Sequence, residues 1–321
     1  MPSPSPRRSP LPSWVAAPLA AGIGAIIPVQ SRINGELGTR LGDPVLAATV
    51  SFGGGLLVML VVALVLPTVR RGLARLPGAV RRRELPPWYL LAGIVGGFLV
   101  LTQSTVVAIV GVAVFTVAIV AGQTLGGLLS DAVGFAQATR RRPTTPRLVG
   151  AGLILVAVGL SASSSLNGGA DWAAVLGPAL LPLLAGLLTG FQYAANARVG
   201  AVAGSPLAAT VMNFLAGMAA LVLVTLIGGS SLPSSLPGEW WLYTGGLYGI
   251  VFIAGTAALV PHTGVLLLGL GTIAGQLIAS LLLDLLAPVA GSGVSGLTVV
   301  GTVLALVAVL VASLRGGRLR R

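Results

Sequence analysis

Two glutamines lie alone in long apolar segments of this 321-residue chain and are its best candidates for chemistry. Gln123 occurs in "GQTLGGLLSD" and Gln276 in "GQLIASLLLD". A side-chain amide offers two hydrogen-bond donors and two acceptors without formal charge, which suits binding a polar solute better than acid–base catalysis. Gln103, flanked by Thr102 and Ser104, adds a third candidate. We therefore predict a solute-binding site that contains Gln123, Gln276 and Gln103.

Catalytic residues are scarce in the chain. It has a single histidine, His262, and no cysteine. Intramembrane hydrolases and metalloenzymes need a nucleophile with a base, or clustered metal ligands, and no such constellation is present in the sequence. We expect no enzyme activity, no bound metal and no cofactor. His262 falls in the tight turn that we expect between two helices.

The composition is that of a chain that lies in lipid. Hydrophobic residues make up 55% and charged residues 8%, and the mean hydropathy is +0.99. A soluble domain carries about 25% charged residues. Apolar runs of roughly 20 residues recur, each long enough to cross a ~30 Å hydrocarbon core as a helix. The sequence predicts an all-α polytopic membrane protein, with the lipid bilayer as its surroundings.

The apolar runs predict ten transmembrane helices. We expect them at 14–33, 44–67, 87–108, 112–135, 148–166, 173–195, 206–228, 239–260, 264–287 and 296–314. A Pro/Ser-rich tail, residues 1–13, precedes them and is expected to be disordered. An Arg-rich segment at 68–86 separates the second and third helices, and a basic tail, residues 315–321, follows the last one.

The basic residues predict the orientation. With the amino terminus in the cytoplasm, every one of the 19 basic residues except Arg32 and Arg40 falls on the cytoplasmic side. Cytoplasmic loops of membrane proteins carry an excess of Lys and Arg. We therefore predict a protein of the bacterial cytoplasmic membrane with both termini in the cytoplasm. The net charge of +12 follows from this topology, and we expect no nucleic-acid partner.

One passage is written twice in the chain. "QSRINGELGTRLGDPVLAATVSFGGG" begins at Gln30, and "QYAANARVGAVAGSPLAATVMNFLAG" begins 162 residues later at Gln192. The motifs around Gln123 and Gln276 repeat at a shorter offset of 153. The two offsets differ because the Arg-rich segment at 68–86 makes the first copy longer than the second. We predict two five-helix repeats, 14–166 and 172–314. Because five is odd, the second repeat enters the membrane inverted, as in many secondary transporters.

These residues resemble a known family. The pattern P-x-Q-x-x-x-N, a G-[DS]-P turn, S/N-F before Gly, and G-Q-x-x-x-x-L-L-x-D are similar to the drug/metabolite transporter superfamily, and within it to the YdcZ-type family. That family comprises small inner-membrane proteins, found as five-helix units and as fused ten-helix chains. The resemblance implies a bundle whose central cavity is lined by the first, third, fourth, sixth, eighth and ninth spans. Pro28 departs from the pattern, since the second repeat reads "GFQ" where the first reads "PVQ".

The repeated passage also contains residues for capping or gating. Asp43 or Ser205 suits a helix N-cap, and the proline that follows each suits the first helical position. Asn34 and Asn196 are expected to end the first and sixth helices, or to act as gates, because Asn tolerates the left-handed conformation. Gln30 and Gln192 are expected near opposite membrane faces, where they suit gates.

Two acids follow the paired glutamines by eight residues. Asp131 and Asp284 each lie near the end of an expected helix. One interpretation is structural, with the carboxylate paired to a nearby Arg. The other is a role in coupling transport to protons, which is weakened because the first expected helix, 14–33, carries no acidic residue at all.

Together these observations favour a secondary transporter or exporter of a small organic solute that works by alternating access. A flippase for a lipid intermediate is the alternative, since the expected cavity has few charges and its cytoplasmic rim has many Arg residues. A membrane scaffold or sensor that transports nothing is a further alternative. A homodimer is compatible with any of these.

Overall fold

The computed structural model describes residues 13–133, 144–163, 172–228, 235–288 and 294–313, and all secondary structure in these ranges is helical. The helices are α1 (Ser13–Leu41), α2 (Pro44–Val65), α3 (Pro67–Arg81), α4 (Gly93–Val133), α5 (Thr145–Ser163), α6 (Trp172–Ala203), α7 (Pro206–Gly228), α8 (Gly245–Leu286) and α9 (Gly296–Ser313). Two short 3₁₀ helices, η1 (Pro87–Leu91) and η4 (Trp240–Thr244), precede α4 and α8. The all-helical prediction is confirmed for the described residues.

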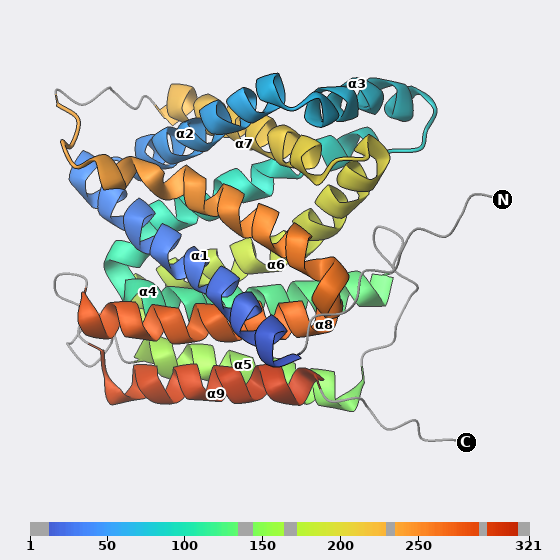
Figure 1. Ribbon diagram of the computed structural model, residues 1–321. Helices are drawn as coiled ribbons and strands as arrows, with labels where there is room; N and C mark the ends of the chain where they lie inside the picture. The colour runs from blue at the N-terminus through green and yellow to red at the C-terminus, as the bar shows by residue number, and fades with distance from the viewer. Residues whose placement is uncertain (1–12, 134–143, 164–171, 229–234, 289–293, 314–321) are drawn as a thin grey trace, which may run out of the picture.

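Two helices are much longer than a single span. α4 has 41 residues and is broken at Gly111, whose φ of 82° and ψ of 168° lie outside the helical region. Glycine adopts such a positive φ without the steric penalty that a Cβ would bring. α8 has 42 residues, and Figure 1 shows that it also folds back on itself as two limbs. Each helix covers two of the predicted spans.

The helices form three tiers in Figure 1. α2 and α7 run side by side along one edge with α3 beside them, and α5 and α9 run side by side along the opposite edge. Between these edges, α1 packs along α8, and α6 packs along α4.

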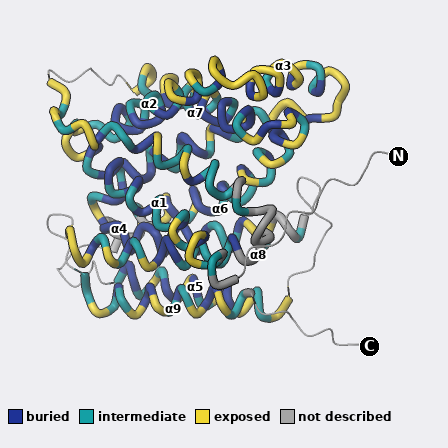
Figure 2. Tube along the Cα trace, in the orientation of Figure 1, coloured by how far each residue is buried: buried dark blue, intermediate teal, exposed yellow. Residues whose placement is uncertain are grey.

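The outer surface of the bundle is apolar. Figure 2 shows exposed residues along the outer sides of α2, α7 and α9, with buried residues concentrated inside. The exposed side chains include Leu64, Leu226, Ile227 and Leu310. Five described stretches, within α2, α4, α5, α7 and α8, are long and apolar enough to cross a membrane, and α9 carries a shorter one. An exposed apolar surface of this extent suits contact with lipid acyl chains.

Glycines allow the central helices to touch backbone to backbone. A methyl group at Gly24 of α1 would overlap the backbone of Thr272 in α8. Likewise, a methyl group at Gly186 of α6 would overlap the carbonyl of Ile119 in α4. Small residues permit this close approach between helices in lipid, where apolar burial supplies no driving force. The two contacts are equivalent under the sequence offsets of 162 and 153.

The Arg-rich segment at 68–86 contains a helix that the sequence pattern did not predict. α3 starts at Pro67, a residue suited to the first helical position, and buries Val69 and Leu76 on one face. The Arg75 guanidinium donates to the carbonyl oxygen of Ala203 at the end of α6, at 3.2 Å. α3 therefore ties this segment to the α6–α7 turn.

The capping predictions have two outcomes. The Asp43 carboxylate accepts from the N–H groups of Val45 and Leu46 at 2.8 and 3.0 Å, so it is the predicted N-cap of α2. The helix ends expected at Asn34 and Asn196 are wrong, because α1 continues to Leu41 and α6 to Ala203.

The positions that end these helices are glycines. Gly42 and Gly204 hold the left-handed conformation, with φ of 65° and 67°. Glycine adopts this conformation at lower cost than asparagine, so Gly42 and Gly204 are well suited to follow the last helical residue.

Candidate solute-binding cavity

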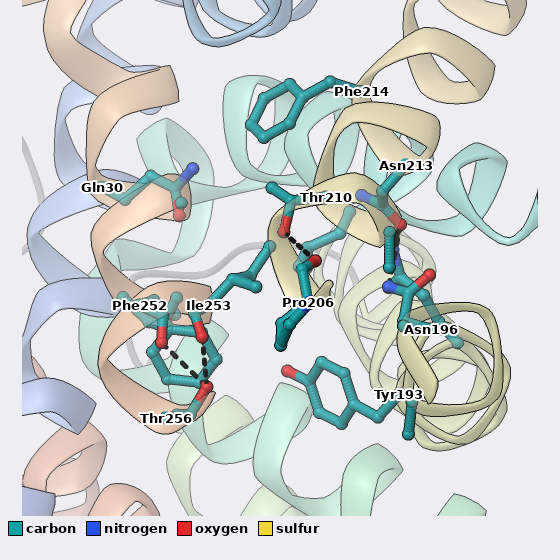
Figure 3. A pocket seen from close by; sticks show the side chains of 18 of the residues that line it. Gln30, Tyr193, Asn196, Pro206, Thr210, Asn213, Phe214, Phe252, Ile253 and Thr256 are labelled. Carbon is teal, nitrogen blue, oxygen red and sulfur yellow. Dashed lines mark hydrogen bonds between the residues drawn. The ribbon is translucent and has the colours of Figure 1, made fainter. Parts of the chain in front are cut away.

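A cavity of about 660 Å³ lies between the central helices. Described residues of α1, α2, α4, α6, α7 and α8 line it. In Figure 3, Gln30 of α1 lies on one side of it and Tyr193 and Asn196 of α6 lie on the other. The volume is within the range of small-molecule sites, which is roughly 300–1,000 Å³.

Three amides form a cluster at the α6 side of the cavity. Gln192 Nε2 and Asn196 Nδ2 both donate to Oδ1 of Asn213 in α7, at 2.8 and 3.0 Å. Gln192 and Asn196 are four residues apart, so they lie on the same face of α6. Because one oxygen accepts both bonds, the carbonyl groups of Gln192 and Asn196 and the amino group of Asn213 are not used within the cluster and can face the cavity.

Gln30 and Gln192, from the two copies of the repeated passage, line the cavity and each packs against a glycine. A Cβ at Gly96 would lie 2.8 Å from Gln192 Nε2, and a Cβ at Gly249 would lie 3.2 Å from Gln30 Nε2. Glycine at these positions therefore leaves room for the amides. Gln192 approaches Gly96 of the first copy, and Gln30 approaches Gly249 of the second copy, so the two contacts are equivalent.

Aromatic rings supply much of the remaining wall. Phe52 and Phe214 pack against each other with ring centroids 4.8 Å apart. Tyr193 is 44% exposed, and Figure 3 shows its hydroxyl pointing into the cavity from α6. Thr256 lies on the α8 side of the cavity, where its hydroxyl donates to the carbonyl oxygens of Phe252 and Ile253 in its own helix.

The equivalent region of the first segment is filled. Ser51 Oγ donates to Asn34 Oδ1 at 2.8 Å, and Asn34 Nδ2 donates to Gln103 Oε1 at 2.7 Å. Gln103 Nε2 donates in turn to Ser31 Oγ at 3.0 Å. These four side chains are fully buried, and together they join α1, α2 and α4. Buried polar networks that are fully paired hold helices in one arrangement.

Tight packing continues along α1 beyond this network. A methyl group at Gly38 would overlap the backbone of Ser104 in α4, and a Cβ at Gly35 would lie 2.9 Å from Val107. The positions equivalent to Gly35 and Gly38 in α6 are Ala197 and Gly200, and both line the cavity. The cavity is therefore open on the α6 side and closed on the α1 side.

An ion pair joins the end of α1 to the segment before α8. Arg40 binds Glu36 at 2.8 Å on its own helix and also binds Glu239, and its guanidinium lies 5.9 Å from the ring centroid of Trp241.

The structure divides the predicted site residues into three sets. Gln30, Gln192 and Asn196 line the cavity. Asn34 and Gln103 belong to the closed network. Gln123 and Gln276 are not among the described lining residues, and their role in solute binding stays a prediction.

Asp284 has a structural contact. Its carboxylate, 7% exposed, accepts from the backbone N–H groups of Val112 and Ala113 at 3.1 and 2.7 Å. These are the first N–H groups after the break at Gly111. The side chains of Asp131 and His262 lie outside the described residues, so the predictions for them stay predictions.

Tyr193, Asn213 and the two phenylalanines were not predicted from the sequence. Asn213 lies within an apolar 23-residue helix, which is the signal that could have identified it. An aromatic residue in an apolar span has no such signal. The lining expected from the resemblance is also corrected: α2 and α7 contribute, while the part of α4 after Gly111 supplies none of the described lining residues.

An all-helical bundle with an apolar surface, and a cavity whose described lining carries no formal charge, suits a membrane protein that binds a small molecule. Within the described residues, no group of three His, Cys, Asp or Glu side chains could hold a metal ion. The family described as "Putative inner membrane exporter, YdcZ" matches residues 15–160 and 177–311. The chain belongs to this family, and the match in two segments agrees with a two-repeat form.

Comparison with other proteins adds evidence for the fold alone. No curated protein matches the chain. One solved structure, titled only "Crystal structure of protein", is similar with a TM-score of 0.57 and 19% identity. The similarity covers 96% of this chain and 99% of that one.

Proposed function

We propose that the chain is a secondary transporter that exports a small organic solute across the cytoplasmic membrane by alternating access. Its two inverted five-helix repeats, 14–166 and 172–314, supply ten spans, with both termini in the cytoplasm. The bend at Gly111 divides α4 into two spans, and 18 residues of helix at 1.5 Å each reach about 27 Å, close to the hydrocarbon thickness.

Equivalent contacts between the segments support the inverted repeat. Besides the pairs at Gly24 and Gly186, Gly275 meets the backbone of Ala21, and its counterpart Gly122 meets the backbone of Leu183. Gly55 and Gly217 each meet the phenylalanine of the opposite helix. Two units that exchange equivalent contacts in this way are related by a twofold axis, which is typical of transporters with inverted repeats.

The main support for alternating access is the difference in packing between the α1 side and the α6 side of the cavity. Two units of similar fold pack differently, tightly at Gly38 and openly at Gly200. If the units exchange their conformations, the cavity closes on the α6 side and opens on the α1 side. With the orientation given by the Arg residues, the α6 side of the cavity opens to the cytoplasm.

Single cysteines test this mechanism, because the natural chain has none. Ala197→Cys lies in the open cavity, and Ser104→Cys is a near-isosteric change at the tight contact with Gly38. In inside-out vesicles, a membrane-impermeant thiol reagent should label Ala197→Cys and spare Ser104→Cys. When the two units exchange conformations, Ala197→Cys in inside-out vesicles should be labelled more slowly. Under the same conditions, Ser104→Cys in right-side-out vesicles should be labelled faster. Reactivities that never change in opposite directions would show that the cavity is static.

The alternatives are less well supported. A lipid flippase needs groups that bind a phosphate, and the described cavity lining contains no Arg or Lys. A scaffold or sensor has no need of an amide-lined cavity between two repeats. The homodimer stays a prediction.

A further inference from the structure

We propose that the solute is an uncharged, amphipathic organic molecule with a planar apolar body and an amide- or hydroxyl-like hydrogen-bonding group. This assignment rests on the proposed function, because it gives a substrate class to the same cavity. Three properties of the lining carry it: its charge, its free hydrogen-bonding groups and its aromatic surface.

The described part of the cavity lining carries no formal charge. No Asp, Glu, Lys, Arg or His is among the described residues of the cavity wall. An ion taken from water into such a site costs several kcal/mol unless a partner of opposite charge is present. The ring of Tyr193 could attract a cation, but a cation–π contact contributes only about 0.5–2 kcal/mol. The desolvation cost is larger, so a neutral solute is favoured over either ion.

The amide cluster offers both donors and acceptors to a solute. The bonds from Gln192 and Asn196 to Asn213 leave two carbonyl oxygens and one amino group free of bonds within the cluster. Exchanging nitrogen and oxygen in all three amides preserves the internal bonds and leaves two amino groups and one oxygen free. In either arrangement, the cluster complements a group that both donates and accepts, such as an amide, a lactam or a hydroxyl.

Gln30 extends this polar surface to the opposite wall. Its side chain lines the cavity and has no hydrogen-bond partner among the described residues. A solute that reaches from the cluster to Gln30 would therefore be bound at both ends by uncharged groups.

The apolar part of the solute is expected to lie along aromatic surface. Tyr193 presents its ring and its hydroxyl to the cavity, and Phe252 lies on the α8 side. Aromatic rings pack against planar groups in offset or edge-on arrangements that contribute about 0.5–1.5 kcal/mol beyond area burial. In the first repeat a serine, Ser31, occupies the position equivalent to Tyr193, and its hydroxyl accepts a hydrogen bond from Gln103 in the closed network. The ring of Tyr193 therefore has no aromatic counterpart in the first repeat.

Three probes that share one indole ring test the class. 3-Indolepropionamide is neutral, tryptamine is a cation at neutral pH and 3-indolepropionate is an anion. Each is added to the purified full-length Ala197→Cys protein, and the rate of alkylation by a maleimide is measured. The neutral probe should slow alkylation at about tenfold lower concentration than either ion, a factor that corresponds to about 1.4 kcal/mol.

Variants in the cavity make the test specific. Tyr193→Phe should weaken protection by the neutral probe roughly two- to tenfold, the range expected for one lost hydrogen bond. Asn196→Asp adds one negative charge at nearly constant shape and should make tryptamine the preferred probe. Asn196→Leu is the matched control, because it removes the amide without adding charge. It should weaken the neutral probe without creating a preference for the cation.

The outcomes separate the substrate class from the transport function. Absence of protection by the neutral probe, or equal protection by a charged one, overturns the class. The labelling of Ala197→Cys and Ser104→Cys in vesicles without probe tests alternating access independently. A static cavity that still prefers the neutral probe would retain the ligand class and reject transport.

Discussion

Asp284 of α8 accepts a 2.7 Å hydrogen bond from the backbone N–H of Ala113, at the bend in α4. Its second carboxylate oxygen accepts from Val112, so one side chain caps a helix that begins in the other half of the sequence. The break at Gly111 frees these N–H groups from helical partners, and an acid at a helix amino terminus satisfies them. The bend of one repeat is therefore held by the other repeat.

This contact predicts that Asp284 stabilises the fold. Asp284→Ala should lower the free energy of unfolding by about 0.5–2 kcal/mol, the usual cost of losing an N-cap. Asp284→Asn should lose less, because the amide oxygen still accepts one bond. Thermal unfolding of both variants in detergent gives the comparison, with transport at two pH values measured alongside. An Asn variant with unchanged melting temperature but without transport would instead indicate a coupling role.

Local features of the fold could be predicted from the sequence. Asp43 and Pro44 fix the start of α2 through a cap and a preset φ, and both effects act within one turn. The repeat could also be recognised, because equivalent contacts such as those of Gly24 and Gly186 constrain both copies alike. The end of α1 was misplaced by eight residues, since Asn34 and Gly42 both tolerate the left-handed conformation and tertiary contacts decide between them.

The resemblance implied a central cavity, but its lining could not be predicted from the residues, because the cavity arises from a difference between the repeats. An earlier expected end of α1 placed Gln30 near a membrane face, whereas in the 29-residue helix it lies closer to the middle. Isolation in an apolar segment was sufficient to select Gln123 and Gln276, but it does not tell which face of a helix meets a cavity. That depends on which repeat is packed tightly, a property of the conformation.

Close packing of α1 against α8 predicts a strong effect of one methyl group. Gly24→Ala would force the added Cβ into the backbone of Thr272, which cannot yield as a side chain can. Overpacking of this kind costs about 1–3 kcal/mol. Gly22→Ala is the control on the same helix, because a methyl group there would meet no atom within 4 Å. Only Gly24→Ala should lower the melting temperature, and equal effects would refute the contact.

We expect that the residues of the closed network can be introduced into the second repeat and will close it. Gln103 and Ser31 fill the first repeat, while Thr256 and Tyr193 occupy the equivalent positions of the second. The double variant Thr256→Gln and Tyr193→Ser should allow the second repeat to form the same network with Asn196. The α6 side should then close, and alkylation of Ala197→Cys from the cytoplasmic side should slow.

The reverse exchange tests the same idea on the other side. Gln103→Thr removes the central member of the closed network and leaves the amide of Asn34 without its acceptor. An unpaired buried group costs about 1–3 kcal/mol, so the closed side should loosen and Ser104→Cys should react faster. If neither exchange alters the reactivity of its reporter, these polar side chains do not set the state of the cavity.

Gln276 is expected to raise activity at a cost in stability. Its side chain is 2% exposed, and Oε1 has no hydrogen-bond partner within the described part of the chain. Leaving a buried acceptor unpaired costs about 1–3 kcal/mol, so Gln276→Leu should raise the melting temperature.

The adjacent Gly275 packs on the backbone of Ala21 in α1, and separation of α1 from α8 would bring the Gln276 amide to the surface of a new cavity. If the amide then binds the solute, as the sequence predicts, the Leu variant should be more stable and should transport poorly, a trade-off common at functional sites. Gln123→Leu, its repeat counterpart with a partly exposed side chain, should lose transport with a smaller gain in stability. Melting temperature and solute uptake into inside-out vesicles measure the two effects, and wild-type uptake by a stabilised Gln276→Leu protein would place the residue outside the solute path.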